Sequence, residues 1–180
     1  SAVLPIGIDF NKFDLIKTKK SNTLPLILWN HRWEYDKNPD EFFNILLLLK
    51  KKGVKFTLCV LGEHGKNYPA VFDKIKLSLA EEIVQWGTVA TIDEYISWLK
   101  RADILPVTSN QDFFGISIVE AIYCQCYPIL PDRLSYREHI SEEFQDGVFY
   151  NSYDELLNTL ERVISEVDKK TELLRMSDYV

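Results

Sequence analysis

Runs of apolar residues alternate with amphipathic segments along most of the chain. The run at 24–30, "LPLILWN", is continuous enough for a buried strand, and the segment at 39–53, "PDEFFNILLLLKKKG", has the spacing of a helix. Further strands are expected at 54–62, 82–87, 104–109, 127–131 and 147–151. Further helices are expected at 67–81, 91–103, 115–126, 135–141 and 152–177. Because strand and helix alternate at the spacing of βα units, the pattern predicts an α/β fold, a Rossmann-like parallel sheet with helices on both faces.

Residues at the expected helix ends support this reading. Lys50 to Lys52 suit the last turn of the helix at 39–53, and Gly53 suits its end. Thr91 and Glu94 have the spacing of a capping box at the start of the helix at 91–103.

The first 23 residues differ from the rest of the chain, because they are polar and strand-poor after "VLPIGID". We expect residues 1–23 to be the remainder of an interdomain linker and residues 24–180 to form one domain. No internal repeat or low-complexity segment interrupts that domain.

Composition narrows the classes of partner. The chain has 180 residues, of which 46% are hydrophobic, which is enough for one domain with a sizeable core. Its 21 basic and 27 acidic residues give a net charge of −6, whereas a domain that grips nucleic acid alone is usually basic. No apolar run is long enough to cross a bilayer, and the start lacks the regions of a signal peptide. We therefore expect a cytoplasmic protein without a membrane span.

The cysteines and histidines do not predict a metal site. Three cysteines, at 59, 124 and 126, argue against a disulfide framework, and we expect the pair at the helix end to be packed side chains. The histidines at 31, 64 and 139 are scattered and lack the spacing of zinc ligands.

Ligands of open parallel sheets bind beyond the carboxyl ends of the strands, which directs attention to five loops. These loops are 29–39, 62–69, 87–91, 108–116 and 131–136. In the first loop, Arg32 offers a planar fork for phosphate oxygens and Lys37 a mobile charge, so the pair could hold a diphosphate. The alternative is a solvated turn whose charges are incidental.

A second group of candidate residues lies in "TSNQDFFGISIVEA", residues 108–121. Gly115 would allow a ligand close to the backbone, and the free N–H groups of the following helix turn favour anions. Asp112 and Glu120 could accept hydrogen bonds from sugar and ribose hydroxyls. The alternative is that Asp112 caps the helix and Glu120 pairs with a surface cation.

Several enzyme classes lack their motif here. No GxGxxG follows the first strand, no GxxxxGK[ST] is present, and no GxSxG elbow occurs. Dinucleotide oxidoreductases, P-loop phosphotransferases and hydrolases with a nucleophile elbow are therefore disfavoured.

Taken together, the ordered motifs resemble the retaining GT-B glycosyltransferases of family 4. The resemblance rests on the Arg–x4–Lys turn after the first strand, the acid–x7–Glu motif around "FG", and "VLPIGIDF", which is similar to the interdomain linker of that family. It covers about residues 3–165 and implies that the chain is the C-terminal, donor-binding half of a GT-B fold.

Within the family, the chain resembles the subfamily that mannosylates queuosine in tRNA. This resemblance rests on "LILWNHRWEYDKNPDEFF", "DFFGISIVEAIYCQCYPILP" and the Trp86–Gly87 pair. This resemblance implies GDP-mannose as donor, tRNA as acceptor, and front-face transfer that needs neither metal nor cofactor. It also implies that an N-terminal domain, absent from these 180 residues, binds most of the tRNA, so that this part alone is inactive.

The resemblance also implies roles for individual residues. Arg32 and Lys37 match the pair that holds the donor diphosphate. Asp112 matches the first acid of the motif, which lies near the sugar, and Glu120 matches the second acid, which binds the ribose. The remaining matches are to the donor-binding loops: Gly62 in the nucleotide loop, Val89 where the base packs, and Phe114, Gly115 and Ile116 where backbone N–H groups meet sugar and phosphate.

Four positions depart from the family pattern. His31 and Asn38 replace glycines beside the Arg and Lys, and both replacements fit the queuosine subfamily. Asp112 is one methylene shorter than the usual Glu. Gln125 stands where a glycine usually ends the helix.

Two other readings are open at this stage. One is a family 4 transferase that uses another nucleotide sugar on a lipid or saccharide. The other is a non-catalytic nucleotide-binding module that has kept the fold. The oligomeric state and the roles of His31 and the neighbouring tryptophans are not predicted.

Overall fold

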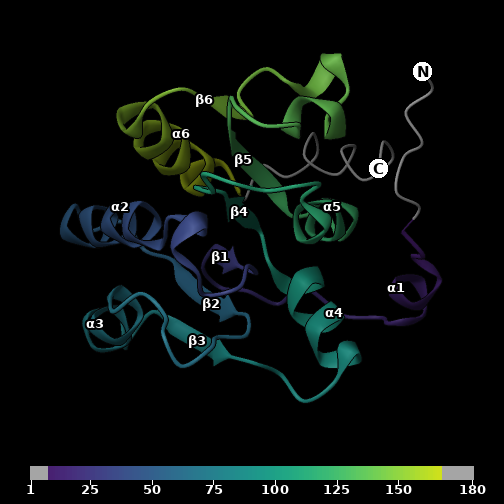
Figure 1. Cartoon of the computed structure of the whole chain (residues 1–180), viewed down its shortest axis with the longest axis horizontal. Coiled ribbons are helices and arrows are strands. Elements are labelled where there is room, and N and C mark those ends of the chain that lie inside the picture. The colour runs from purple at the N-terminus through teal and green to yellow at the C-terminus, as the bar shows by residue number, and fades with distance from the viewer. Residues whose placement is uncertain (1–7, 168–180) are drawn as a thin grey trace.

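The computed structural model describes residues 8–167 and contains one parallel sheet of six strands (Figure 1). In chain order the strands are β1 (Leu26–Trp29), β2 (Thr57–Leu61), β3 (Ile83–Gly87), β4 (Ile104–Pro106), β5 (Tyr127–Pro131) and β6 (Phe149–Tyr150). Their order across the sheet is β3-β2-β1-β4-β5-β6, and all neighbouring strands are parallel. The predicted α/β class with a Rossmann-like parallel sheet is confirmed.

Helices cover both faces of this sheet, as Figure 1 shows. On one side lie α2 (Pro39–Lys51), α3 (Val71–Ser78) and α6 (Tyr153–Glu166), and on the other lie α4 (Ile92–Arg101) and α5 (Ile116–Tyr123). Strands β1 and β4 are adjacent at the centre, where the strand order reverses. The loops that follow these two strands therefore leave the same edge of the sheet side by side, which is the usual ligand position in such folds.

The central strand β1 is buried along its whole length, which accounts for its continuous apolar sequence. Trp29 ends the strand and is fully buried, and its ring contacts Phe42, Phe43 and Phe72 from helices α2 and α3. This aromatic packing fixes the point at which the chain leaves the sheet toward the first candidate loop.

The N-terminal segment contains a helix that the sequence did not predict. Helix α1 (Asn11–Leu15) lies within the stretch read as a linker, and its Phe13 is buried. Phe10 stacks on Tyr123 with ring centroids 3.8 Å apart, and Lys20 Nζ donates to the carbonyl of Ala102 at 2.7 Å. The described part of this segment is thus packed on the domain, while residues 1–7 of the expected linker lie outside the described residues.

The capping signal at Thr91 is confirmed, whereas several short helical segments differ from their predictions. Thr91 accepts a hydrogen bond from Glu94 N at 3.1 Å, as the capping pattern predicts, although the Glu94 carboxylate meets Ala90 N instead of Thr91 N. The segment expected as a helix at 135–141 forms a 3-10 turn at Tyr136–His139. Short 3-10 turns at Tyr35–Lys37 and Glu142–Phe144 were not expected, and the predicted helix beyond residue 167 lies outside the described residues.

Helix α5 ends in the left-handed conformation even though no glycine is present. Gln125 has φ +65° and its N–H donates to Ile122 O at 2.8 Å, while Cys126 N donates to Ala121 O at 3.0 Å. This pair of bonds is the Schellman arrangement, in which glycine is preferred because it has no Cβ. The helix keeps the usual ending of its type and places a strained glutamine there.

Candidate functional site

The loops after β1 and β4 are bonded to each other at the sheet edge. Thr108 Oγ1 is buried and lies 2.9 Å from Lys37 O and 3.0 Å from Asn38 O, which accept its hydrogen bond. Asn110 N donates to Asp36 O at 2.7 Å. Asn38 adopts φ +51°, which asparagine tolerates better than most residues, and this turns the chain into α2. The two sequence motifs therefore form one site.

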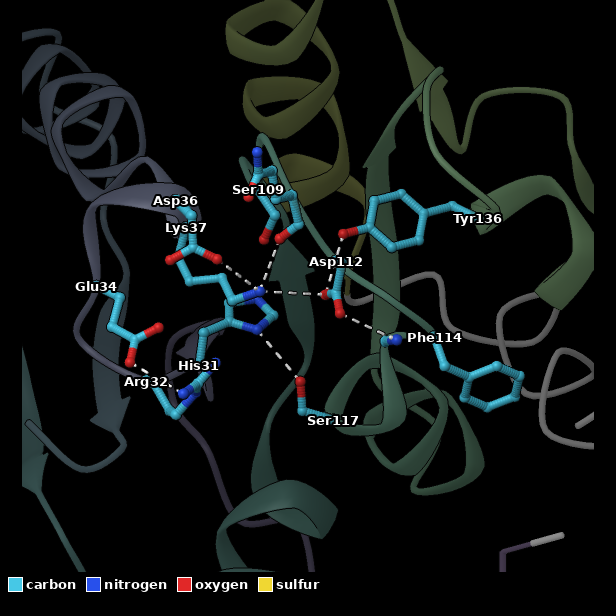
Figure 2. A network of polar contacts seen from close by, with 12 residues as sticks. His31, Arg32, Glu34, Asp36, Lys37, Ser109, Asp112, Phe114, Ser117 and Tyr136 are labelled. Carbon is cyan, nitrogen blue, oxygen red and sulfur yellow. Dashed lines mark hydrogen bonds and ion pairs between the residues drawn. The ribbon is translucent and has the colours of Figure 1, made fainter. Parts of the chain in front are cut away.

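Lys37 lies inside this site, and only 7% of the residue is exposed. Its Nζ donates to Gln111 O at 2.8 Å and lies 3.3 Å from Asp36 Oδ2 and 3.7 Å from Asp112 Oδ2 (Figure 2). The reading of the turn as solvated with incidental charges is therefore wrong for Lys37. A buried ammonium is stabilised only where acceptors surround it, and here two carboxylates and a carbonyl do so.

Asp112 is held from two further directions. Its Oδ1 accepts a hydrogen bond from Gly115 N at 3.1 Å, and its Oδ2 accepts one from the Tyr136 hydroxyl at 3.2 Å. Burial and the nearby Asp112 carboxylate raise the pKa of Tyr136, which keeps that hydroxyl protonated as a donor. The carboxylate is thus fixed beside the Lys37 ammonium and the start of α5.

Gly115 is required by its backbone conformation and by its surroundings. It has φ +77°, and a Cβ at this position would lie 3.2 Å from Ile118 Cδ1 and 3.3 Å from Tyr136 Cε1. Its carbonyl accepts hydrogen bonds from Ile118 N and Val119 N, which starts α5. The first N–H groups of the helix have no intrahelical acceptor, and they begin next to Asp112.

Arg32 is not joined to this cluster. Its side chain is 66% exposed and its Nη1 pairs with Glu34 Oε1 at 3.0 Å, as Figure 2 shows. Exposed pairs of this kind contribute about 0–1 kcal/mol, so the guanidinium can exchange Glu34 for a stronger anionic partner. The structure brings Lys37, Asp112 and Gly115 together and leaves Arg32 at the rim of the site.

Glu120 lies in the second turn of α5, and its partner is not a surface cation. Its Oε2 accepts a hydrogen bond of 2.7 Å from the hydroxyl of Tyr95, which comes from α4. Burial raises the pKa of Glu120, and the Tyr95 bond opposes this rise. Sequence reasoning missed Tyr95, because nothing in the chain signals a partner 25 residues away on another helix.

Two residues at the end of β1 hold the first turn of α5. Asn30 Nδ2 donates to Ser117 O at 2.7 Å, and the Ser117 hydroxyl lies 3.2 Å from His31 Nδ1. His31 is 3% exposed, and burial lowers its pKa from 6.5 to about 4. The imidazole is therefore neutral at physiological pH, and the turn that carries Arg32 is tied to the helix that carries Glu120.

The other predicted glycine, Gly62, is required by a close backbone approach. It has φ +128°, and a Cβ there would lie 2.2 Å from His31 O. Trp33 N also donates to Glu63 O at 3.0 Å, so the loop after β2 runs directly against the turn after β1. Gly62 thus lies next to the site, beneath the turn that carries Arg32.

The tryptophan next to the cationic residues supports the same turn. Trp33 stacks on Phe72 at 4.3 Å and on His64 at 4.9 Å between ring centroids, and its Nε1 donates to Leu61 O at 3.3 Å. Together with buried Trp29, it fixes the turn to the sheet. The tryptophans are therefore packing residues of the loop.

The remaining predicted residues lie at the rim or in neighbouring loops. Val89, in the loop after β3, is half-buried against the core. Ile116 is 45% exposed at the start of α5, and the ring of Phe114 packs against His139 with centroids 4.8 Å apart. No direct contact within the described residues joins Val89 to the Lys37–Asp112 pair.

Within residues 8–167, no three histidine, cysteine or acidic side chains gather in a way that could hold a metal ion. The three cysteines are buried as free thiols, and burial raises the pKa of Cys124 to about 12, which fits packed side chains. No helix in the described part of the chain is long and apolar enough to cross a membrane.

Residues 11–177 match the family described as glycosyl transferases group 1. The chain belongs to the group 1 glycosyl transferases.

A curated relative of this group 1 glycosyl transferase is the tRNA-queuosine alpha-mannosyltransferase of Drosophila melanogaster. The two are 36% identical over 117 residues, which cover 65% of this chain and 31% of the relative. The chain thus spans about a third of that relative's length.

Solved structures of glycosyl transferases share the fold. The C-terminal domain of the group 1 protein LpcC from Francisella tularensis has a TM-score of 0.73 at 19% identity, with 97% of this chain and 96% of that chain covered. The pneumococcal O-GlcNAc transferase GtfA, solved with UDP and GlcNAc, has a TM-score of 0.63 at 18% identity, with 90% of this chain and 33% of that chain covered. The TM-scores of 0.73 and 0.63 show that the chain has a GT-B-like fold.

Proposed function

We propose that this chain is the donor-binding domain of an enzyme that transfers mannose from GDP-mannose to queuosine in tRNA, with retention of configuration. The 36% identity to a tRNA-queuosine alpha-mannosyltransferase supports the choice of substrates. The single structural observation that supports donor binding is the meeting of the Lys37 ammonium with Asp112 at the start of α5. We also propose that the enzyme is cytoplasmic.

In this proposal the diphosphate lies against Lys37 and the first N–H groups of α5. Lys37 gives up its 3.7 Å contact with Asp112 for a phosphate oxygen, and Arg32 swings from the exposed Glu34 to the same anion. Asp112 then accepts from hydroxyls of the sugar, and Glu120 from hydroxyls of the ribose. Val89 packs against the base, and the backbone from Phe114 to Ile116 meets the sugar and the phosphate.

The same groups would lower the barrier of the transfer step. The bond between the anomeric carbon of mannose and the phosphate oxygen breaks, and a bond forms from that carbon to an oxygen of the acceptor. The acceptor hydroxyl gives its proton to the leaving phosphate on the same face of the sugar. Negative charge grows on the diphosphate, so Lys37, Arg32 and the start of α5 stabilise the transition state more than the ground state. The step as written uses no metal or cofactor.

The tRNA is proposed to bind mainly outside these 180 residues. The net charge of −6 is unfavourable for a surface that holds a nucleic-acid backbone. The relative is about three times as long as the matched region, which leaves room for an N-terminal acceptor domain. The chain alone would then bind the donor without turnover.

Titration calorimetry with GDP, UDP, GDP-mannose and UDP-glucose tests the proposal. We expect the chain to bind GDP and GDP-mannose and to discriminate against the uridine compounds. Lys37→Ala and Arg32→Ala should each weaken GDP binding about tenfold or more, because each removes a charge-assisted hydrogen bond to the diphosphate. Lys66→Ala is the matched control, because it also removes one cation but at an exposed position of the neighbouring loop.

Three outcomes would count against the proposal. A preference for UDP would indicate a transferase with another donor, and the absence of nucleotide binding would contradict a donor site in this chain. If neither Lys37→Ala nor Arg32→Ala weakened binding, the diphosphate would have to lie elsewhere.

A further inference from the structure

Three buried side-chain atoms near this site have no hydrogen-bond partner within the described residues: Asn30 Oδ1, Ser109 Oγ and His31 Nε2. His31 Nε2 is buried, and no acceptor or donor in residues 8–167 reaches it. Such atoms are rare in folded proteins, because an unpaired buried polar group costs about 1–3 kcal/mol. The other ring nitrogen, Nδ1, faces the Ser117 hydroxyl at 3.2 Å.

The contact with Ser117 is compatible with a tautomer in which Nε2 carries the ring proton. Within residues 8–167 the Ser117 hydroxyl contacts His31 Nδ1 and can donate its proton to that nitrogen. The neutral imidazole then carries its proton on Nε2, because only one ring nitrogen is protonated in that state. In this tautomer the unpaired atom is an N–H donor.

This donor lies beside the residues that are proposed to hold the diphosphate. The charges that act on the His31 ring are those of Asp112, Lys37 and Asp36. In Figure 2 the ring lies next to the contacts of the Lys37 ammonium, with Nδ1 turned to Ser117. The Trp29 indole donates to the backbone carbonyl of His31 at 2.9 Å, which holds the backbone, and packs edge-on to the imidazole.

We propose that His31 is a further donor-binding residue, whose Nε2–H donates to an oxygen of the bound nucleoside diphosphate. The inference rests on the proposed function, since it requires that the diphosphate occupy this site. When the Lys37 ammonium moves from Asp112 to the phosphate, the Nε2–H becomes accessible and gains the acceptor that it lacks in the free protein. A neutral donor binds the anion without adding a charge that burial would penalise.

Two substitutions separate this role from a purely structural one. The amide of His31→Asn reaches about as far as Nδ1 and can keep the contact with Ser117, whereas that of His31→Gln reaches about as far as Nε2 and can keep the distal donor. We expect His31→Asn to weaken GDP binding about tenfold and His31→Gln to retain most of the affinity, because the loss of one hydrogen bond to a charged group is of this size. Thermal unfolding of both variants controls for damage to the fold.

The imidazole itself provides a second measurement in the wild-type chain. Long-range ¹H–¹⁵N correlation spectra should show His31 protonated on Nε2 and not on Nδ1, and the Nε2–H resonance should move downfield when GDP is added. Guanosine, which has no phosphate, should leave that resonance in place.

The results distinguish the inference from the function on which it rests. If the wild type binds GDP but His31→Asn binds as tightly as His31→Gln and the Nε2–H resonance does not move, His31 only supports the turn and the inference is overturned. If the wild type binds no nucleotide at all, both the inference and the donor site are overturned.

Discussion

At the scale of single residues, the site depends on side chains that hold other side chains. Asp112 is fixed by Gly115 N and by Tyr136, and Glu120 is fixed by Tyr95 from another helix. Sequence reasoning could place Asp112 and Glu120, because they lie in one local motif with Gly115. It could not place Tyr95 or Tyr136, because their contacts depend on how α4 and the loop after β5 fold back on α5.

The Tyr95 hydroxyl should set the pH range of nucleotide binding. Burial raises the pKa of Glu120 and the Tyr95 bond lowers it, so Tyr95→Phe should raise that pKa further. If ionised Glu120 accepts from the ribose, binding is present above its pKa and is lost as the pH falls through it. We therefore expect the acid loss of GDP affinity to begin at a higher pH in Tyr95→Phe.

Measurement of the GDP dissociation constant between pH 4 and pH 8 checks this expectation. Tyr68→Phe is a suitable control, because it removes a hydroxyl that bonds to Asp73, away from Glu120. Superimposable pH profiles for the wild type and Tyr95→Phe would show that the hydroxyl has no effect on Glu120.

Gly62 should tolerate no side chain, because the backbone of the neighbouring loop occupies the position that a Cβ would need. A Cβ would lie 2.2 Å from His31 O, and φ is +128°. Gly62→Ala should lower the free energy of unfolding by roughly 1–3 kcal/mol or more, and it should displace the turn that carries Arg32. Gly65→Ala, in the same loop, has nothing within 4 Å and should be close to neutral. Urea denaturation of both variants measures the difference, and equal stabilities would contradict the proposed close packing of the two loops.

At the scale of elements, apolar runs predicted the six strands, and β1, β4 and β5 are buried throughout while the edge strand β3 is only half-buried. Helix α1 escaped prediction because it has five residues and no side-chain cap, so its stability comes from tertiary contacts such as that of Phe10 with Tyr123. The start of α3 was placed too early, since the predicted helix at 67–81 begins only at Val71, after Pro69. Such boundaries depend on packing that local sequence does not contain.

The end of α5 offers a test of local backbone strain. Gln125 adopts φ +65° at a position where glycine carries no Cβ penalty. Gln125→Gly should therefore raise the free energy of unfolding by about 1 kcal/mol. Lys74→Gly, at an exposed position inside α3, should lower it by a similar amount, because glycine is a poor helix former. If chemical denaturation showed that Gln125→Gly destabilises the protein, the Gln125 side chain would have to make a compensating contact.

At the scale of the whole molecule, the two motifs that lie far apart in the sequence meet because the strand order reverses between β1 and β4. A parallel sheet and the edge on which its ligands bind could be predicted from the alternation of strands and helices, whereas the order of the strands could not. The orientation of Arg32 toward Glu34 and the burial of Lys37 could not be predicted from the sequence, because both follow from side-chain packing. The acidic domain supplies one small cationic site, and it is proposed to leave the tRNA to another part of the enzyme.

The central claim is tested most directly by assaying the full-length protein for transfer of labelled mannose from GDP-mannose to tRNA. The account predicts that tRNA containing queuosine is labelled, that tRNA lacking queuosine is not, and that Lys37→Ala abolishes most of the transfer because the diphosphate loses its buried partner. Equal labelling of both tRNAs, or full activity of Lys37→Ala, would contradict the account.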